Sequence, residues 1–177
     1  MLKLRKNKKG FTLVELIVVI AIMAVLAGTV AGVTVSQLNK QTNNTAKSEA
    51  QTLVSDFRNF MIDYTLPAPD TGNTNNWKEG DKVKNVPGLT QAVKDFIKDN
   101  QQEDKLFLVE EGETEKDWKA GDHKFNVKVD SVTKEIEVDG EKTNTTEYTV
   151  TFYCTQKGNN ASQKPTATYT YNDELAG

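Results

Sequence analysis

The stretch that decides the fold lies near the start of the chain and reads Lys8-Lys9-Gly10-Phe11-Thr12-Leu13-Val14-Glu15. Five basic residues crowd into the first nine positions: Lys3, Arg5, Lys6, Lys8 and Lys9. From Phe11 to Val35 every residue except Glu15 is apolar, small or hydroxylic. A helix of this length, rising about 1.5 Å per residue, crosses the hydrocarbon core of a bilayer, and its basic end stays on the cytoplasmic side. We therefore expect a membrane helix at residues 11–36.

Glu15 is the one charged residue in this apolar segment. A carboxylate within a membrane helix is costly unless a partner neutralises it, so such residues are usually functional. The position of Glu15, one turn into the helix, predicts a functional role for its charge.

An ordinary secretory signal has an apolar region of about 7–15 residues, followed by a small-residue cleavage site. Here the apolar run is longer, no such site follows it, and the glycine placed like a processing site, Gly10, precedes it. A generic signal-anchor segment is one interpretation. The residues also resemble the class III signal of type IV pilins and their relatives, over about residues 5–40. The matching positions are Lys9, Gly10, Phe11, Thr12, Leu13 and Glu15.

The resemblance implies a processing and assembly pathway. A prepilin peptidase would cut between Gly10 and Phe11, remove residues 1–10 as a leader, and methylate the new amine of Phe11. Glu15 would then pair with the N-terminus of a neighbouring subunit. The implied partners are copies of this chain and other pilins, the peptidase/methyltransferase and the pilus assembly machinery. The implied locations are the cytoplasmic membrane, with the head outside, and afterwards the cell surface.

Composition limits the remainder of the chain. Its 177 residues provide one small globular domain beyond the membrane helix. The net charge is −3, and removing the five basic leader residues leaves 17 Lys and Arg against 25 Asp and Glu, a charge of −8. This balance gives no reason to expect nucleic acid as a partner. Cys154 is the single cysteine, so no intrachain disulfide forms, and the chain is similar to the disulfide-free pilins of Gram-positive bacteria.

Helical periodicity continues past the membrane segment. Apolar or small residues recur at three- and four-residue steps and predict one buried stripe: Ala46, Ala50, Leu53, Val54, Phe57, Phe60, Met61 and Tyr64. We predict one helix from Thr12 to about Tyr64, ended by Pro67 and Pro69 and roughly 80 Å long. Gly28 and Gly32 lie inside it, and they predict either close helix packing or a segment that melts locally.

The rest of the chain predicts a sheet. After a loop at 66–88, an amphipathic helix at 89–97 precedes segments in which apolar and polar residues alternate. We expect strands at 106–109, 125–129, 136–138, 148–154 and 166–171, with turns at Asp130-Ser131 and Asp139-Gly140. The predicted fold is α+β: a long N-terminal helix packed on a four- to five-stranded antiparallel sheet, as in type IV pilins. Cys154 is expected to be a small buried strand residue.

Catalytic patterns find little support, so we expect no enzyme and no cofactor. His123 is the single histidine and is expected to be a solvated residue at a strand edge, with a ligand or base as the alternative. No Cys/His spacing suits zinc and no Gly-rich loop suits phosphate. The acidic run from Glu110 to Asp117 lacks the Gly-interleaved pattern of a calcium loop, so we interpret it as a solvated loop.

A short internal repeat has two interpretations. Trp77-Lys78-Glu79-Gly80-Asp81 and Trp118-Lys119-Ala120-Gly121-Asp122 share the pattern Trp-Lys-x-Gly-Asp. Either the repeat is a recurring turn with glycine at a positive φ and tryptophan covering it, or Trp77 and Trp118 form an exposed patch that binds glycans or surfaces.

Together these observations predict a structural pilus subunit with three parts: a leader at 1–10, a polymerisation helix at 11–36, and a head at 37–177 that includes the amphipathic helix at 37–65. A minor pilin, or a pseudopilin of a type II secretion or DNA-uptake system, is the alternative within the family. A membrane-anchored extracellular binding module that never polymerises is the alternative from another class. The expected roles of the filament are adhesion, twitching motility and biofilm formation, and the sequence does not choose among them.

Overall fold

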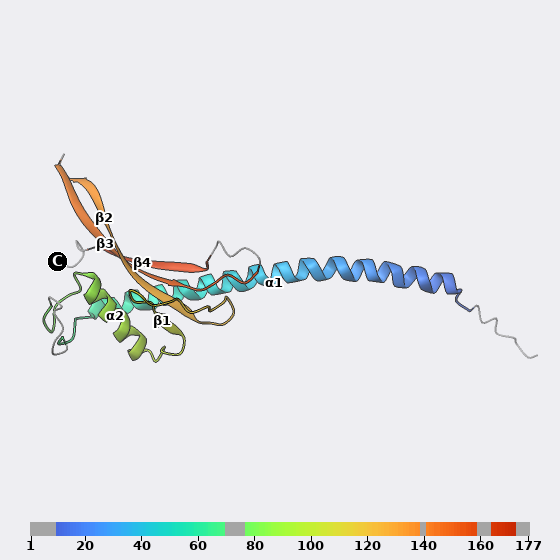
Figure 1. The fold of residues 1–177 in the computed structure, drawn as a ribbon, viewed down its shortest axis with the longest axis horizontal. Helices are drawn as coiled ribbons and strands as arrows, with labels where there is room; N and C mark the ends of the chain where they lie inside the picture. Colours follow the sequence, from blue (N-terminus) through green and yellow to red (C-terminus); the bar gives the residue numbers. More distant parts are fainter. Residues whose placement is uncertain (1–9, 70–76, 139–140, 159–163, 173–177) are drawn as a thin grey trace, which may run out of the picture. The chain divides into compact units, whose positions relative to one another are not determined.

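The computed structural model describes residues 10–69, 77–138, 141–158 and 164–172. The chain divides into two compact units, residues 1–39 and residues 40–177, and each is described by itself. Helix α1 (Leu13–Asp63) supplies all the regular structure in the described part of the first unit, and its second half belongs to the other unit (Figure 1). The predicted leader, except Gly10, lies outside the described residues.

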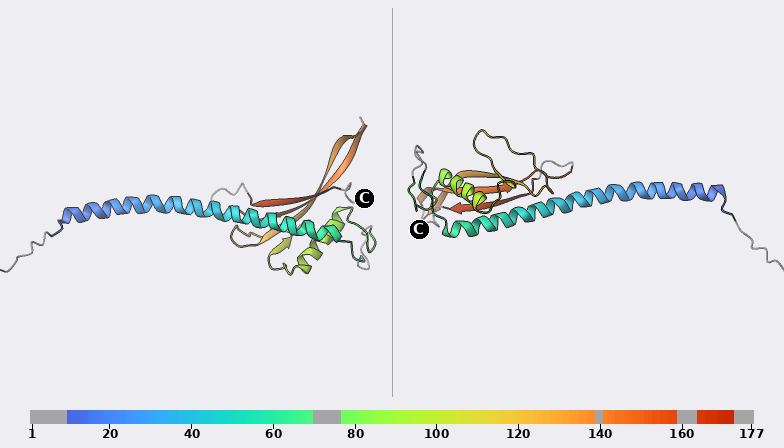
Figure 2. Two further views of the ribbon diagram at one scale, coloured as in Figure 1. Left: turned by 180° about the vertical axis from the view of Figure 1, so that it is seen from behind. Right: turned by 90° about the horizontal axis from the view of Figure 1, so that it is seen from below.

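The second unit is α+β, as predicted. Besides the second half of α1 it contains α2 (Val86–Asp99), β1 (Leu106–Leu108), β2 (Phe125–Val138), β3 (Glu141–Tyr153) and β4 (Thr166–Asn172). The four strands form one sheet in the order β1-β2-β3-β4. The second half of α1 lies along one face of this sheet, and α2 lies beside it (Figure 2). The sequence therefore predicted the layers correctly.

Local sequence signals explain why the residues of α2 form a helix. Asn85 is the N-cap, and its side-chain oxygen accepts a hydrogen bond of 2.8 Å from the backbone N–H of Gly88. Pro87 occupies the first turn, where its fixed φ favours a helix and its missing N–H costs nothing. The predicted apolar stripe is buried in the structure: Leu89, Ala92, Val93, Phe96 and Ile97.

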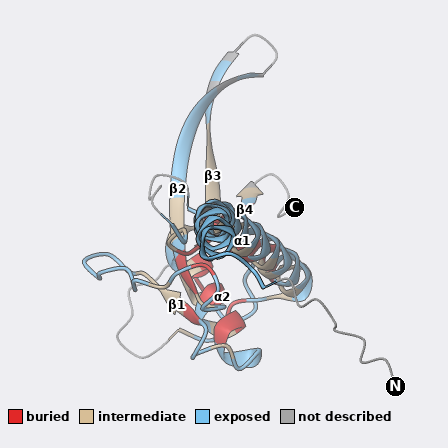
Figure 3. Cartoon of the chain, turned by 90° about the vertical axis from the view of Figure 1, so that its right-hand side faces the viewer, coloured by how far each residue is buried: buried red, intermediate tan, exposed pale blue. Residues whose placement is uncertain are grey.

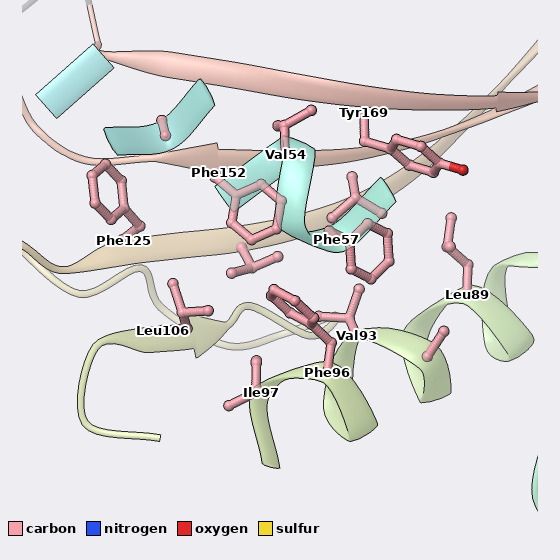
Figure 4. Packing of buried hydrophobic residues seen from close by; sticks show 14 of the residues in the cluster. Val54, Phe57, Leu89, Val93, Phe96, Ile97, Leu106, Phe125, Phe152 and Tyr169 are labelled. Carbon is pink, nitrogen blue, oxygen red and sulfur yellow. The ribbon is translucent and has the colours of Figure 1, made fainter. Parts of the chain in front are cut away.

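The core is centred on Phe57 of α1, which is completely buried. Its ring lies 5.3 Å from that of Phe96 on α2 and 5.3 Å from that of Tyr169 on β4, both edge-on. Phe152 of β3 completes the cluster at 6.2 Å (Figure 4). Every residue of the predicted α1 stripe is in this core or packs against it. The second half of α1 is therefore an integral part of the head.

The sheet differs from the prediction in one respect, because it is mixed. β2, β3 and β4 are antiparallel to their neighbours, but β1 runs parallel to β2, with Leu106 opposite Phe125. Parallel neighbours need a long crossover connection. The connection of residues 109–124 supplies it, and the sequence rules that favour hairpins did not anticipate this path.

The turn predicted at Asp130-Ser131 is wrong, because β2 continues through it. Pairing between β2 and β3 runs without interruption from Asn126 opposite Tyr153 to Val138 opposite Glu141. The apolar alternation changes phase after Val129 because the strand there leaves the part of the sheet that the helices cover. The residues from Ser131 to Glu135 are exposed, so burial no longer fixes which face is apolar. The turn predicted at Asp139-Gly140 lies outside the described residues.

Candidate functional site

The first turn of α1 carries a capping box. The Glu15 carboxylate accepts hydrogen bonds from the Thr12 backbone N–H at 2.8 Å and from the Thr12 hydroxyl at 2.7 Å. In return, the Glu15 N–H donates to the Thr12 hydroxyl oxygen at 3.3 Å. This reciprocal pattern satisfies backbone donors that a helix start leaves without partners, and it places a negative charge at the positive end of the helix dipole.

The capping box gives Thr12 a role that sequence reasoning did not assign to it. The signal was present, because a Ser or Thr followed three residues later by Glu, just before an apolar run, is typical of a helix N-terminus. Both bonds to the carboxylate reach the same oxygen, Oε2. Among the described residues no bond reaches the other oxygen, so Oε1 is available to a partner outside the chain.

The predicted cleavage junction precedes this turn. Gly10 and Phe11 are exposed and lie outside the helix, which begins at Leu13. Phe11 is 91% exposed, so the peptide bond between them is accessible from solvent. An accessible peptide outside regular structure is the kind of segment that a protease can bind. The roles of Gly10 and Phe11 remain predictions.

The first half of α1 is apolar on all sides. Large apolar side chains from Leu13 to Leu38 are all exposed in the single chain. By length and composition, α1 is the one helix among the described residues that is long and apolar enough to cross a membrane. A surface of this kind requires lipid or other helices around it.

Gly28 and Gly32 both lie within α1, which keeps its helical conformation through them. A Cβ added at Gly28 would meet no atom within 4 Å, so no contact within this chain requires a glycine there. Two neighbouring hydroxyls bond back to the helix, Thr29 to the Leu26 carbonyl at 3.0 Å and Thr34 to the Val30 carbonyl at 2.8 Å. Close packing and local melting in an assembly stay the two predictions for this segment.

The Trp-Lys-x-Gly-Asp repeat is a recurring turn. Asp81 accepts a hydrogen bond of 2.7 Å from the Lys78 N–H, and Asp122 accepts one of 2.7 Å from the Lys119 N–H. Gly80 has a φ of 88° and Gly121 a φ of 97°, both in the region that favours glycine. The recurring turn and its positive-φ glycine are therefore confirmed, and the covering role of tryptophan stays a prediction.

The two tryptophans do not form one exposed patch. Trp77 is buried, and its indole N–H donates to the Pro67 carbonyl at 3.1 Å. Trp118 is half-buried, packs edge-on against Phe107 at 6.3 Å, and has the Lys124 ammonium 5.7 Å from its ring. Trp77 is part of the core. A surface-binding role for Trp118 stays a prediction.

The other candidate groups from the sequence are His123, Cys154 and the acidic run, and each has a structural explanation. The His123 ring nitrogen Nδ1 lies 2.7 Å from a Glu49 carboxylate oxygen, and the histidine is exposed. Cys154 is buried, and burial raises the pKa of its thiol to about 11. The acidic run lines an open groove of about 810 Å3 beside α2 and β2, where Lys94 pairs with Glu110 at 2.5 Å. In the part of the chain that the structure describes, no group of three or more His, Cys, Asp or Glu residues is arranged to hold a metal ion.

Comparison with known families gives one match. Residues 5–31 match the prokaryotic N-terminal methylation motif, the class III signal of type IV pilin-like proteins. Comparison with curated proteins and with solved structures gives no match. The motif indicates a type IV pilin-like or pseudopilin protein and points to a structural role. It implies processing by a prepilin peptidase and assembly into pili or pseudopili, and with the apolar helix it fits anchoring in a membrane before assembly.

Proposed function

We propose that this chain is a structural subunit of a type IV pilus. The precursor lies in the cytoplasmic membrane through residues 11–36, with residues 37–177 outside. A prepilin peptidase removes residues 1–10 and methylates the amine of Phe11. The subunits then polymerise into a surface filament that serves adhesion, motility or biofilm formation.

The observation that carries this proposal is the position and hydrogen bonding of the Glu15 carboxylate. Its carboxylate is the one charge in the apolar half of α1, and one of its oxygens is committed to Thr12. Cleavage after Gly10 creates a positive amine at Phe11. An ion pair between the Glu15 carboxylate of one subunit and the Phe11 amine of the next would neutralise both charges within lipid. The pair exists only in the polymer, so it favours assembly and sets the axial position of each subunit.

The apolar surface of α1 supports the same conclusion. Once a subunit leaves the membrane, its exposed apolar side chains need new neighbours, since exposure to water costs about 25 cal/mol per Å2. Bundling the helices of many subunits supplies those neighbours. The heads then form the outer surface, where they contact substrates or other cells.

Microscopy of sheared surface material, labelled with an antibody to the head, tests the proposal. We expect label along the whole filament. Label only at filament tips would instead indicate a minor pilin, and short structures that stay in the envelope would indicate a pseudopilin of a secretion or DNA-uptake system. Label on cell bodies with no filaments would contradict the proposal and favour an anchored binding module.

A further inference from the structure

Among the described residues, no strand pairs with the outer edge of β4. β4 is last in the strand order, and its seven residues, Thr166–Asn172, include no charge, no proline and no glycine. An edge strand presents unpaired backbone groups, and natural proteins usually protect such an edge with a charge, a proline or a bulge. β4 has no charge, proline or bulge within it. Its Thr and Tyr residues favour extended structure.

The alternation of antiparallel pairing shows which backbone groups of β4 face outward. The Cys154 N–H donates to the Pro165 carbonyl at 3.3 Å, and hydrogen-bonded pairs then recur at every second residue. The backbone groups of Thr166, Thr168 and Thr170 therefore face away from β3. Within the described ranges, no backbone–backbone hydrogen bond outside the sheet ladder involves these three residues. Their side chains are exposed as well.

The far part of the β2–β3 hairpin, Ser131–Thr146 without its undescribed turn, is called here the β2–β3 arm. β1 pairs only with Phe125–Val127, and β4 reaches β3 only as far as Glu147. The arm therefore has two strands, and it projects beyond β4 and the helices of the same unit (Figure 3). Its β2 residues from Ser131 to Glu135 are exposed. A ribbon of two strands is only marginally stable in water by itself, so further pairing would stabilise it.

In the described part of the chain, no strand pairs with the outer edge of β2 in the arm either. The Phe125 N–H donates to the Lys105 carbonyl and the Val127 carbonyl accepts from Val109, both at 2.8 Å. Odd-numbered residues of β2 thus direct their backbone groups toward β1, and beyond β1 the same alternation places Thr133 and Glu135 at an open edge.

Charge on the arm is largely paired across its strands. Lys142 lies 2.7 Å from a Glu135 carboxylate oxygen, and Lys134 is paired with Glu147. Since β4 carries no charge, the two open edges can approach without bringing like charges together.

We propose that the β2 edge of the arm adds as a strand to the open β4 edge of a second copy of this chain. The two edges are different surfaces of the same chain, so the contact is heterologous. Heterologous contacts that do not close repeat along an open helical filament. This is the kind of contact that a pilus requires, and the inference rests on the proposed function. Strand addition would link neighbouring heads through backbone hydrogen bonds, independently of the packing of their apolar helices.

Cysteine cross-linking in filaments tests the contact. The full chain is expressed with its peptidase and assembly machinery, and Thr168→Cys is combined in turn with Ser131→Cys, Thr133→Cys and Glu135→Cys. Facing residues of adjacent strands lie within the Cα separation of about 4.4–6.8 Å that a disulfide spans. Cys154 does not compete, because it is only 1% exposed. We expect at least one pair to give a ladder of disulfide-linked oligomers after mild oxidation, and each single variant to give none.

A proline variant supplies a second measurement. Thr168→Pro removes an N–H that faces outward and leaves the ladder with β3 intact, since proline is tolerated at strand edges in this orientation. Thr168→Ala is the matched control, because it loses the same hydroxyl but keeps the N–H. We expect several-fold fewer filaments from the proline variant than from the alanine variant, with equal amounts of processed subunit.

The outcomes separate this inference from the proposed function. Abundant filaments without any cross-linked ladder would overturn the strand addition and leave the pilus subunit intact. A covalent dimer from Thr168→Cys alone would show that two β4 edges pair with each other, which also overturns it. Absence of filaments from the unmodified, processed chain would instead contradict the proposed function.

Discussion

Glu15 accepts two hydrogen bonds from Thr12, and both reach the same carboxylate oxygen. The capping box therefore holds the carboxylate at the start of α1 while leaving its second oxygen free within the described chain. In the proposed filament this one residue would have two roles, stabilising the helix end and attracting the positive amine of another subunit. The two roles predict different consequences for substitutions at the two positions.

Glu15→Val removes the charge and both bonds, so we expect normal processing but few or no filaments. Thr12→Ala is the matched variant, because it loses the hydroxyl but keeps the backbone N–H and the Glu15 charge. Loss of a capping side chain costs about 0.5–2 kcal/mol of helix stability, so filaments should persist at reduced number. Counting filaments by microscopy, beside immunoblots of processed subunit, measures both effects. Normal filament numbers from Glu15→Val would remove the assembly role.

The proposed processing site is the Gly10–Phe11 junction, which is exposed and precedes the helix. Gly10→Val places a branched side chain where the peptidase must approach the backbone, so we expect uncut precursor in the membrane. Mass analysis of the unmodified chain should give a mature N-terminus at N-methylated Phe11. A mature chain that retains Met1, or that is cut after Ala31, would contradict this prediction.

The sequence predicted those parts of the fold in which burial imposes a period. The α1 stripe around Phe57 and the α2 stripe around Phe96 were both predicted, because each faces a core that requires apolar residues at helical spacing. The parallel pairing of β1 was not predicted, because it depends on the path of a long polar connection. The β2–β3 arm was missed for a related reason: its residues from Ser131 to Glu135 are all exposed, on both faces of the strand, so their alternation reports no core.

The sequence predicted the charged residue of the candidate site, Glu15, but not the hydrogen bonds that hold it. Glu15 stands out in the sequence because it is the one charge in an apolar segment, whereas its bonds to Thr12 depend on where the helix begins. The burial of Trp77 could not be predicted in this way. The same turn motif contains Trp77 and Trp118, and the motif alone does not indicate which tryptophan the core buries.

The head should require the second half of α1 for folding. Phe57 contacts the rings of residues on α2, β3 and β4, so a fragment that begins at Pro67 lacks the centre of its core. We expect that fragment to aggregate or remain unfolded, and a fragment that begins at Gln37 to be a folded monomer with mixed helix and strand. Circular dichroism and gel filtration distinguish these states. Cooperative unfolding of the shorter fragment would contradict the helix-on-sheet core.

A point substitution measures the same dependence. Phe57→Ala in the longer fragment should lower the free energy of unfolding by about 3–5 kcal/mol, because it leaves a cavity among four aromatic rings. Ile62→Ala on the same helix is the control. Ile62 is 66% exposed, so its loss should change stability by no more than about 0.5 kcal/mol. Denaturant titration of both variants gives the comparison.

The buried thiol predicts a pH dependence. Burial raises the pKa of Cys154 from an ordinary value of 9.0 to about 11, with the charges of Asp122 and Glu49 acting in the same direction. The unfolded chain therefore loses this proton at lower pH than the folded head, and the group's contribution to stability falls as pH rises from about 9 to about 11. Cys154→Ala should flatten that part of the stability profile. A thiol reagent at pH 8 should modify the unfolded chain quickly and the folded head very slowly.

The two turns of the Trp-Lys-x-Gly-Asp repeat should differ in their tolerance of a side chain. Gly80 and Gly121 both have a positive φ, so alanine is strained at either position, by about 1–3 kcal/mol. A Cβ at Gly80 would meet nothing within 4 Å, whereas one at Gly121 would lie 3.1 Å from the Thr42 methyl carbon Cγ2 on α1. We therefore expect Gly121→Ala to destabilise the head more than Gly80→Ala does.

Removing the Thr42 methyl group tests the cause of that difference. Thr42→Ser keeps the hydroxyl and deletes Cγ2, so the double variant Thr42→Ser/Gly121→Ala should recover the part of the loss that comes from crowding and retain the part that comes from backbone strain. In a double-mutant cycle the two changes should be coupled favourably, since they concern groups in direct contact. Thr42→Ser combined with Gly80→Ala is the control pair and should be additive. If the two cycles show the same coupling, close packing of the second turn against α1 is not what distinguishes the turns.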